Sequence, residues 1–406
     1  MLNKRMAVLN LKTLYFLLFS VVLFIECNPV IRENIQVRYP AILFMCWTAV
    51  VYFLRCGRIK VNIFWAWSII VLGYMFTTSL WGINAKDTIQ AVKNLLIVSL
   101  ITAMTSLMIE NIFDIKKVIY GIIFAYGAET MYVLSRIDLF DLGRKRIGSD
   151  YIGLSQWNAN AIGSFTAIGC VFSVLCLLKK KQRRKKYIIE AFLILFFGSI
   201  MLLTGSRKAL IIIVGTIFLF VCFYNGEHKR WRNIFLAALA GILLFVFIMI
   251  NDELYMLIGA RIVRLIQELT GYKTGENSMS LRKSMIFSGL QWFLQKPVLG
   301  YGLDGFAEMY GQSKGWKVYS HCNFIEILVG GGLVGFFLYY FIYIYILDKL
   351  RKRVFEHYDI AETFIFSLLL VLLFNNAALV CYADIIYISI IMLAGSYLKF
   401  QIQGGS

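Results

Sequence analysis

Apolar stretches of roughly 17 to 25 residues, the length that carries a helix across a bilayer, recur along this whole sequence. With 60% hydrophobic residues, a chain of 406 residues could not hide so much apolar surface in a water-soluble core. The sequence therefore predicts an all-α polytopic membrane protein. About twelve transmembrane helices are expected, at 11–27, 38–54, 61–81, 88–109, 117–134, 157–178, 187–204, 208–224, 234–251, 322–347, 361–380 and 382–398.

Lysine and arginine gather in every second connection between these predicted spans. Cytoplasmic loops carry the excess of positive charge in membrane proteins, so these connections are expected to lie inside. The N-terminus and the C-terminus then share the inner side, and residues 252–321 face outward as a large helical loop between the ninth and tenth spans. We expect residues 1–403 to form a single transmembrane domain that contains this loop, and residues 404–406 to be a cloning remnant.

The net charge of +18 does not indicate nucleic-acid binding, because the inner basic residues lie in short loops beside predicted spans, as topology alone requires. The eight cysteines show no spacing typical of a metal site or a disulfide framework. Residues 300–305 fit the pattern G-x-G-x-x-G, but that pattern marks a dinucleotide site only between a strand and a helix. We expect no nucleic acid, metal or cofactor, and we expect these glycines to form tight turns.

Arg207 lies in a very short connection, 204–208, and is expected at the outer membrane boundary. The next span begins there, so its free backbone N–H groups and the positive end of its dipole would help Arg207 to hold an anion. The alternative is an arginine that reaches out to lipid phosphate. Arg146 belongs to a second outward basic loop, 135–156, where the alternative is a solvated loop paired with its own aspartates.

His321 lies where the outer loop returns to the membrane, and Glu326 follows it inside the predicted span. A histidine can act as a general base at neutral pH. The alternative for a single histidine at the membrane boundary is a structural hydrogen bond. An acid at the depth of Glu326 is costly unless it has a partner, so we expect it to be paired.

Two further expectations concern packing between spans. Lys93 and Glu129 fall at similar depths on consecutive predicted spans and are expected to form an ion pair. Gly331 and Gly335 have the small-xxx-small spacing that lets helices approach closely.

Several of these segments together resemble the superfamily of O-antigen ligases and Wzy-type O-antigen and capsular polysaccharide polymerases. The segments are Thr204-Gly205-Ser206-Arg207, Asn158-Ala159-Asn160-Ala161, Arg282 to Trp292 followed by Pro297-Val298-Leu299-Gly300-Tyr301-Gly302, and Ser320-His321-Cys322-Asn323-Phe324-Ile325-Glu326. The resemblance covers mainly residues 140 to 345. Each motif is weak alone, but their order and their side of the membrane make the set fairly specific.

The resemblance implies a metal-independent glycosyltransferase of the GT-C type that uses an undecaprenyl-diphosphate-linked oligosaccharide at the outer face of a bacterial cytoplasmic membrane. It also implies that Arg207 and Arg282 bind the diphosphate, with Arg146 as a further candidate, and that His321 activates the acceptor hydroxyl. Tyr319, Asn323 and Glu326 are expected to support His321. A chain-length regulator and a flippase of the same pathway would be its protein partners.

We therefore hypothesise a polymerase that transfers glycan onto the terminal sugar of another lipid-linked repeat unit. The nearest rival is a ligase that passes glycan to a lipid A core or another terminal acceptor. A rival of another class is a polysaccharide lipid flippase or transporter, for which internal repeats and charged or broken helices near the midplane would be expected. No clear repeat is present, and the candidate residues fall on one face of the membrane.

Overall fold

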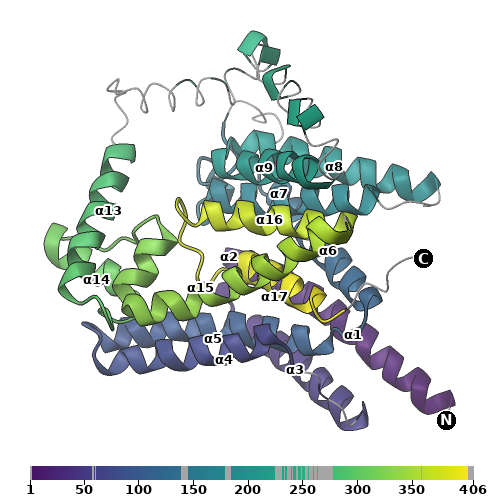
Figure 1. Ribbon diagram of the computed structural model, residues 1–406, viewed down its shortest axis with the longest axis horizontal. Coiled ribbons are helices and arrows are strands. Elements are labelled where there is room, and N and C mark those ends of the chain that lie inside the picture. The colour runs from purple at the N-terminus through teal and green to yellow at the C-terminus, as the bar shows by residue number, and fades with distance from the viewer. Residues whose placement is uncertain are drawn as a thin grey trace.

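The computed structural model describes residues 2–56, 59, 61–138, 145–178, 184–224, 278–357 and 359–400, with scattered positions between 231 and 263. All elements in these ranges are helical (Figure 1). They are α1 Leu2–Cys27, α2 Pro29–Glu33, α3 Ile35–Cys56, α4 Ile63–Thr77, η1 Thr78–Leu80, α5 Ala85–Met108, α6 Ile112–Leu134, η3 Ile152–Leu154, α7 Ala159–Leu177, α8 Arg184–Thr204, α9 Arg207–Tyr224, α13 Ser278–Gln295, α14 Gly305–Lys314, α15 Asn323–His357, α16 Ile360–Asn375 and α17 Ile385–Tyr397.

The predicted polytopic membrane fold is confirmed. In the described ranges, eight helices are long and apolar enough to cross a membrane, and α16 and α17 are shorter apolar helices at predicted spans. α6 covers the predicted span 117–134. The predicted span 234–251 and the loop residues 252–277 fall largely outside the described residues, as do residues 404–406.

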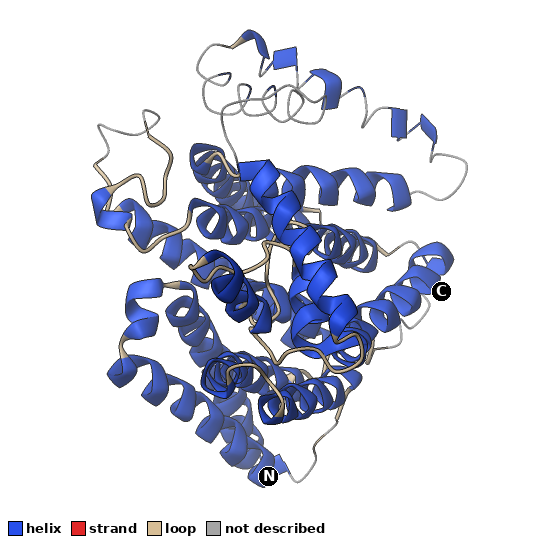
Figure 2. Ribbon diagram, turned by 90° about the vertical axis from the view of Figure 1, so that its left-hand side faces the viewer, coloured by secondary structure: helices blue, strands red, loops and turns tan. Residues whose placement is uncertain are grey.

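The described part of the predicted outer loop lies at one end of the helix bundle. α13 and α14 pack there against the start of α15, while the two ends of the chain lie at the opposite end (Figure 1). Figure 2 looks onto the α13 and α14 end and shows loops between the helices. Both contacts follow from a small separate core, in which Met285 of α13 and Phe306 of α14 pack with Val329 of α15.

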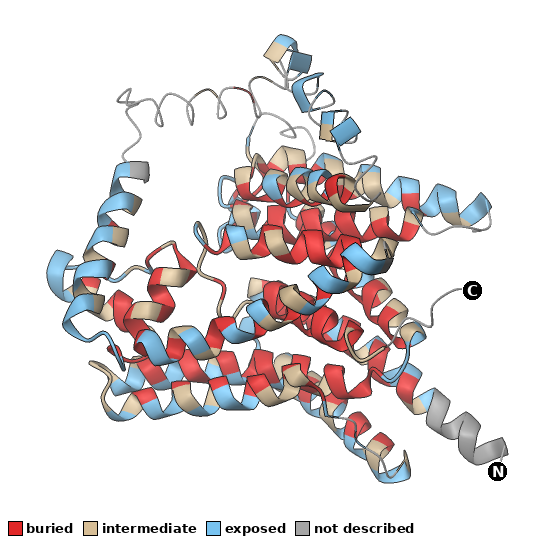
Figure 3. Ribbon diagram, in the orientation of Figure 1, coloured by how far each residue is buried: buried red, intermediate tan, exposed pale blue. Residues whose placement is uncertain are grey.

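The most buried helices lie in the middle of the bundle, whereas α13 is largely exposed (Figure 3). In α7, 78% of the residues in its apolar stretch of 18 residues are buried, whereas the corresponding share is 28% in α8 and in α9. Small residues allow this close packing. A Cβ at Gly163 would lie 2.7 Å from the Cβ of Ser206, and one at Gly169 would lie 2.8 Å from the Phe197 ring.

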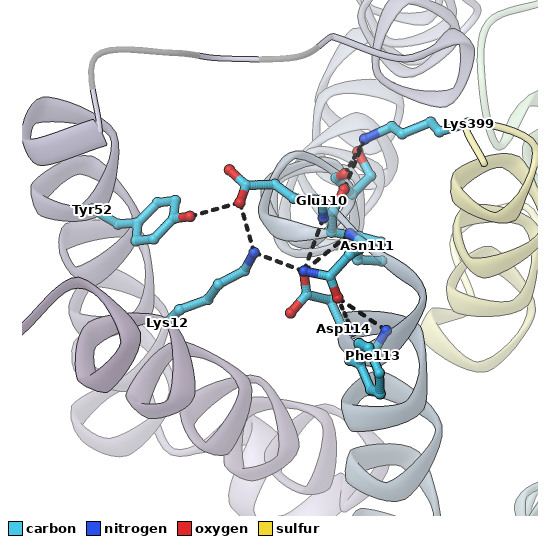
Figure 4. A network of polar contacts seen from close by, with 9 residues as sticks. Lys12, Tyr52, Glu110, Asn111, Phe113, Asp114 and Lys399 are labelled. Carbon is cyan, nitrogen blue, oxygen red and sulfur yellow. Dashed lines mark hydrogen bonds and ion pairs between the residues drawn. The ribbon is translucent and has the colours of Figure 1, made fainter. Parts of the chain in front are cut away.

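A polar network joins several helices at the end opposite α13 (Figure 4). Lys12 of α1 is buried, and its Nζ lies 2.9 Å from Glu110 and 2.7 Å from Asp114. Tyr52 of α3 donates to the same Glu110 carboxylate at 2.9 Å. Lys399 donates to the carbonyl oxygens of Ser106 and Ile109, so the connection between α5 and α6 is held from three sides.

α15 is broken at Gly332, whose φ of 62° and ψ of −164° are not helical. The break leaves backbone groups that need new partners, and residues 297–302 provide them. Tyr301 N and Gly302 N donate to the carbonyls of Val329 and Gly330 at 2.8 and 2.9 Å. In return, the N–H groups on the far side of the break donate to the carbonyls of residues 297 and 298.

The glycine-rich segment forms tight turns, as predicted. Gly300 and Gly302 both have positive φ, and a Cβ at Gly300 would lie 2.6 Å from the carbonyl oxygen of Val329. Gly331 and Gly335 pack on Tyr74 and Met75 of α4, which confirms the small-xxx-small prediction. The Tyr74 hydroxyl also donates to the Gly331 carbonyl at 2.6 Å.

The predicted pair of Lys93 and Glu129 is wrong. Glu129 is buried and accepts hydrogen bonds from Asn28 at 3.0 Å and Trp157 at 2.9 Å. Lys93 is exposed and lies over the ring of Tyr39. Depth along two spans does not say which way each side chain points around its helix, and these two point to different neighbours.

The substitution Gly332→Ala should destabilise the protein by about 3 kcal/mol or more, because a Cβ there would lie 2.2 Å from the Val298 oxygen in a conformation open almost only to glycine. The thermal unfolding midpoint of purified protein in detergent measures this. Gly73→Ala is the matched control, since nothing lies within 4 Å of its Cβ position. Equal midpoints for the two variants would contradict the structural role of the break.

Candidate functional site

Arg207 opens α9 directly after a tight turn. Gly205 has a φ of 55°, and Ser206 N donates to the Thr204 hydroxyl at 3.2 Å. The Ser206 hydroxyl donates to the side-chain oxygen of Asn160, near the start of α7, at 3.0 Å. The start of α9 is therefore fixed by the start of α7, and Ala209 N in its first turn donates to the Ser206 hydroxyl at 3.4 Å.

Arg146 lies against this same turn. Its Nε donates to the Thr204 carbonyl at 2.6 Å, and its Nη2 lies 3.3 Å from the Asn160 side-chain oxygen. Ile147 N also donates to the Leu203 carbonyl at 3.2 Å. The predicted neighbourhood of Arg146 and Arg207 is therefore present. At least two of the five N–H donors of Arg146, however, form hydrogen bonds with protein acceptors. Arg146 therefore holds the turn in place.

His321 occupies a strained turn before α15. Its φ of 59° lies in the left-handed region, which is uncommon outside glycine. The turn is tied by the Ser320 hydroxyl, which donates to the Cys322 carbonyl at 2.7 Å and accepts from Cys322 N at 3.2 Å. The exposed ring of Tyr319 lies against the imidazole, with 4.3 Å between ring centroids. The backbone thus sets the direction of the imidazole.

Glu326, in the first turn of α15, supports the turn that contains His321. It is 1% exposed, and its Oε2 accepts a 2.8 Å hydrogen bond from Ser320 N. The expected partner of this buried acid is therefore a backbone N–H and not a cation. Its other oxygen has no hydrogen-bond partner in the described part of the chain. Glu326 therefore holds the residue before His321, and its role in supporting a catalytic histidine stays a prediction.

Two cations act on His321. Burial, and then the positive charges of Arg282 and Lys208, lower the pKa of His321 from its usual 6.5 to about 4. Arg282 comes from α13 and Lys208 from the first turn of α9, so three segments distant in sequence meet here. The predicted meeting of Arg282 with His321 is present. The imidazole is therefore neutral at pH 7 and free to accept a proton.

Lys208 was not predicted as a site residue. It is 8% exposed, and its ammonium donates to the carbonyl of Ala378, between α16 and α17. In the sequence it follows Arg207 and resembles any basic residue at a span end. Within the described ranges no hydrogen bond or ion pair involves the guanidinium group of Arg207.

Asn323 joins the start of α15 to this same connection between α16 and α17. Its backbone N donates to the Asn376 carbonyl at 2.7 Å, and its side-chain oxygen accepts from Cys381 N at 2.9 Å. Its amide group donates to the Tyr340 hydroxyl at 2.8 Å. Because Lys208 contacts Ala378 in the same segment, residues 376–381 tie the start of α9 to the residue that follows the His321 turn.

The site offers positive charge and a base. Among the described residues, no group of three or more His, Cys, Asp or Glu is placed to hold a metal ion. Arg282 and Lys208 can bind the oxygens of an anion, and the neutral imidazole can accept a proton from a hydroxyl group beside it.

Asn323→Ala should lower the unfolding free energy by about 2 kcal/mol or more, because the buried Cys381 N–H and Tyr340 hydroxyl lose their partner. The unfolding midpoint in detergent measures the loss. Asn94→Ala is the control, since the side chain of Asn94 forms no hydrogen bond in the described part of the chain. A midpoint like that of the wild type would show that Asn323 does not hold this connection.

Comparison with known proteins gives two matches. Residues 191–340 match the family model described as O-antigen ligase, a segment that contains Arg207, Arg282, His321, Asn323 and Glu326. An uncharacterised protein of Archaeoglobus fulgidus is 32% identical over 63 residues, which are 16% of this chain and 33% of that relative, so the match spans about a third of the relative's length. Residues 191–340 of this chain are therefore similar to the O-antigen ligase family, in agreement with the resemblance that its motifs indicated.

Proposed function

We propose that this protein is a polysaccharide polymerase, a metal-independent glycosyltransferase of the GT-C type. It transfers undecaprenyl-diphosphate-linked glycan onto the terminal sugar hydroxyl of another lipid-linked repeat unit. The reaction takes place at the outer face of a bacterial cytoplasmic membrane, with both chain ends inside. The observation that supports this most is the meeting of His321 with Arg282 and Lys208 beside the start of α9.

The reaction needs little more than these groups. The acceptor oxygen attacks the anomeric carbon of the donor, and the bond from that carbon to the diphosphate oxygen breaks. The hydroxyl proton passes to His321, and undecaprenyl diphosphate leaves with the bonding electrons. Arg282 and Lys208 stabilise the negative charge that develops on it, and Arg207 with the N–H groups of α9 adds to the same field.

The two cations also regulate the base. In the free protein they lower the pKa of His321, so the imidazole stays neutral and is a weak base. A bound diphosphate would cancel their charge and raise this pKa towards its usual value. His321 would then accept a proton more readily once the donor is in place. Deprotonation of the acceptor is thereby linked to occupancy of the donor site.

A ligase is the second candidate, because the matching family is described as O-antigen ligase. The same groups would serve a ligase, which differs only in the acceptor. A flippase or transporter fits the site less well, since Arg146, Arg282, Lys208 and His321 lie at the α13 and α14 end rather than along a path through the bundle. A chain-length regulator and a flippase of the same pathway would be partners of the polymerase.

Purified protein incubated with a defined undecaprenyl-diphosphate-linked repeat unit tests the proposal. The wild type should form a ladder of products, whereas His321→Ala should form none and still bind the lipid-linked substrate, because only proton transfer is lost. Gel separation of the glycans measures this. Transfer of a single repeat to another acceptor would indicate the ligase, and ladders from His321→Ala would refute the role of His321.

The pH profile provides a separate test. With a pKa of about 4, His321 is in its base form above that pH, so kcat/KM should stay level from pH 7 down to about 5 and fall only below it. Lys208→Met removes one positive neighbour and should raise the pH at which kcat/KM falls, whereas Lys208→Arg keeps the charge and should not. A wild-type fall centred near pH 6.5 would contradict the electrostatic part of this mechanism.

A further inference from the structure

A cavity of about 290 Å³ lies behind the connection between α16 and α17. Residues 380–386 form one wall, and the end of α1, α2, the middle of α5 and the first turn of α7 form the others. The volume is near the lower limit of ~300–1,000 Å³ for small-molecule sites, which gives room for about one or two sugar rings. None of the predicted site residues lines it.

The charges around this cavity nearly balance. Glu26 lies in the wall, but its two carboxylate oxygens accept hydrogen bonds from Nε and Nη2 of Arg38, at 2.7 and 2.9 Å. Asp384 and Arg32 remain, with opposite charges that interact across the cavity. A diphosphate would gain little binding energy in this cavity. It would gain more on the other side of the connection, where Lys208 and Arg282 lie. The cavity suits an uncharged polar ligand.

The lining offers hydrogen-bonding groups beside apolar surface. Asp384 caps α17 by accepting from Ile386 N at 2.8 Å, and a carboxylate has about four acceptor positions, so others stay open to ligand hydroxyls. Arg32 is exposed, and its guanidinium group forms no hydrogen bond within the described part of the chain. Val98 and Ala161 provide apolar surface. A mixture of this kind fits a sugar ring, with its hydroxyl edge and apolar faces.

The cavity is connected to the catalytic groups by short structural links. Cys381 lines it and is bound through its backbone N by Asn323, two residues after His321. Ala161 lines it from the α7 turn on which Asn160 contacts Arg146 and Ser206. A glycan held in the cavity would therefore lie across a single connection from the anion site.

We propose that this cavity is a carbohydrate subsite that holds an uncharged, hydroxyl-rich sugar of the substrate, with Asp384 and Arg32 as its hydrogen-bonding groups. This inference rests on the proposed function. The two sites bind different parts of one substrate. The diphosphate binds to Arg282 and Lys208, and the uncharged sugar binds in the cavity behind residues 376–381.

Two probes separate the two sites. One is the oligosaccharide released by mild acid from the host's own lipid-linked repeat unit, and the other is undecaprenyl diphosphate without glycan. Ala161→Phe fills the cavity, and Asp384→Asn keeps a good helix cap while removing the charge. Each should raise the Kd for the oligosaccharide about tenfold or more, because ligand contacts are lost, and leave the Kd for undecaprenyl diphosphate unchanged.

Ala85→Phe is the matched control, because Ala85 is exposed at the start of α5 and does not line the cavity. It should bind both probes like the wild type. Arg282→Ala should show the opposite pattern to the cavity variants. It should raise the Kd for undecaprenyl diphosphate and leave the Kd for the oligosaccharide unchanged. Two results would overturn the proposed subsite and leave the proposed function standing. They are unchanged oligosaccharide binding in Ala161→Phe and Asp384→Asn, or no oligosaccharide binding by the wild type. Failure of the wild type to bind undecaprenyl diphosphate would overturn the proposed function.

Discussion

The break in α15 at Gly332 is the constraint on which the α13 and α14 end of the molecule depends. A helix interrupted inside a membrane protein exposes carbonyl and N–H groups that must find partners, and residues 297–302 satisfy them with backbone hydrogen bonds. This exchange fixes the segment between α13 and α14 against α15. It thereby places Arg282, on α13, relative to His321, which precedes α15. The geometry of the candidate site is therefore a consequence of these backbone hydrogen bonds more than of contacts between its side chains.

The connection between α16 and α17 acts as the second fixed element. Lys208 holds it from α9, and Asn323 holds it from α15, so this connection ties Lys208 to the residues that follow His321. A strained His321 persists because Ser320 and Glu326 fix the residues around it. Strain of this kind is typical of a site in which one side chain must keep a single direction.

The sequence was sufficient for features that depend on local properties. Span length, the turns at Gly300 and Gly302 and the packing of Gly331 on α4 follow from short stretches of residues. Lys208 was missed because its burial depends on Ala378, far along the chain, and the Lys93 pair failed because rotation around a helix is not visible in a hydropathy pattern. The cavity, with walls from separate segments, could not be predicted at all.

The network around Lys12 has an energetic consequence for how the protein can work. Separating a buried cation from its carboxylates costs about 3–5 kcal/mol. Here the cation is Lys12 of α1, which binds both Glu110 and Asp114. A carrier that opens to each side in turn would meet this cost in every cycle. The network therefore opposes any separation of α1 from Glu110 and Asp114, which an opening at this end of the bundle would require.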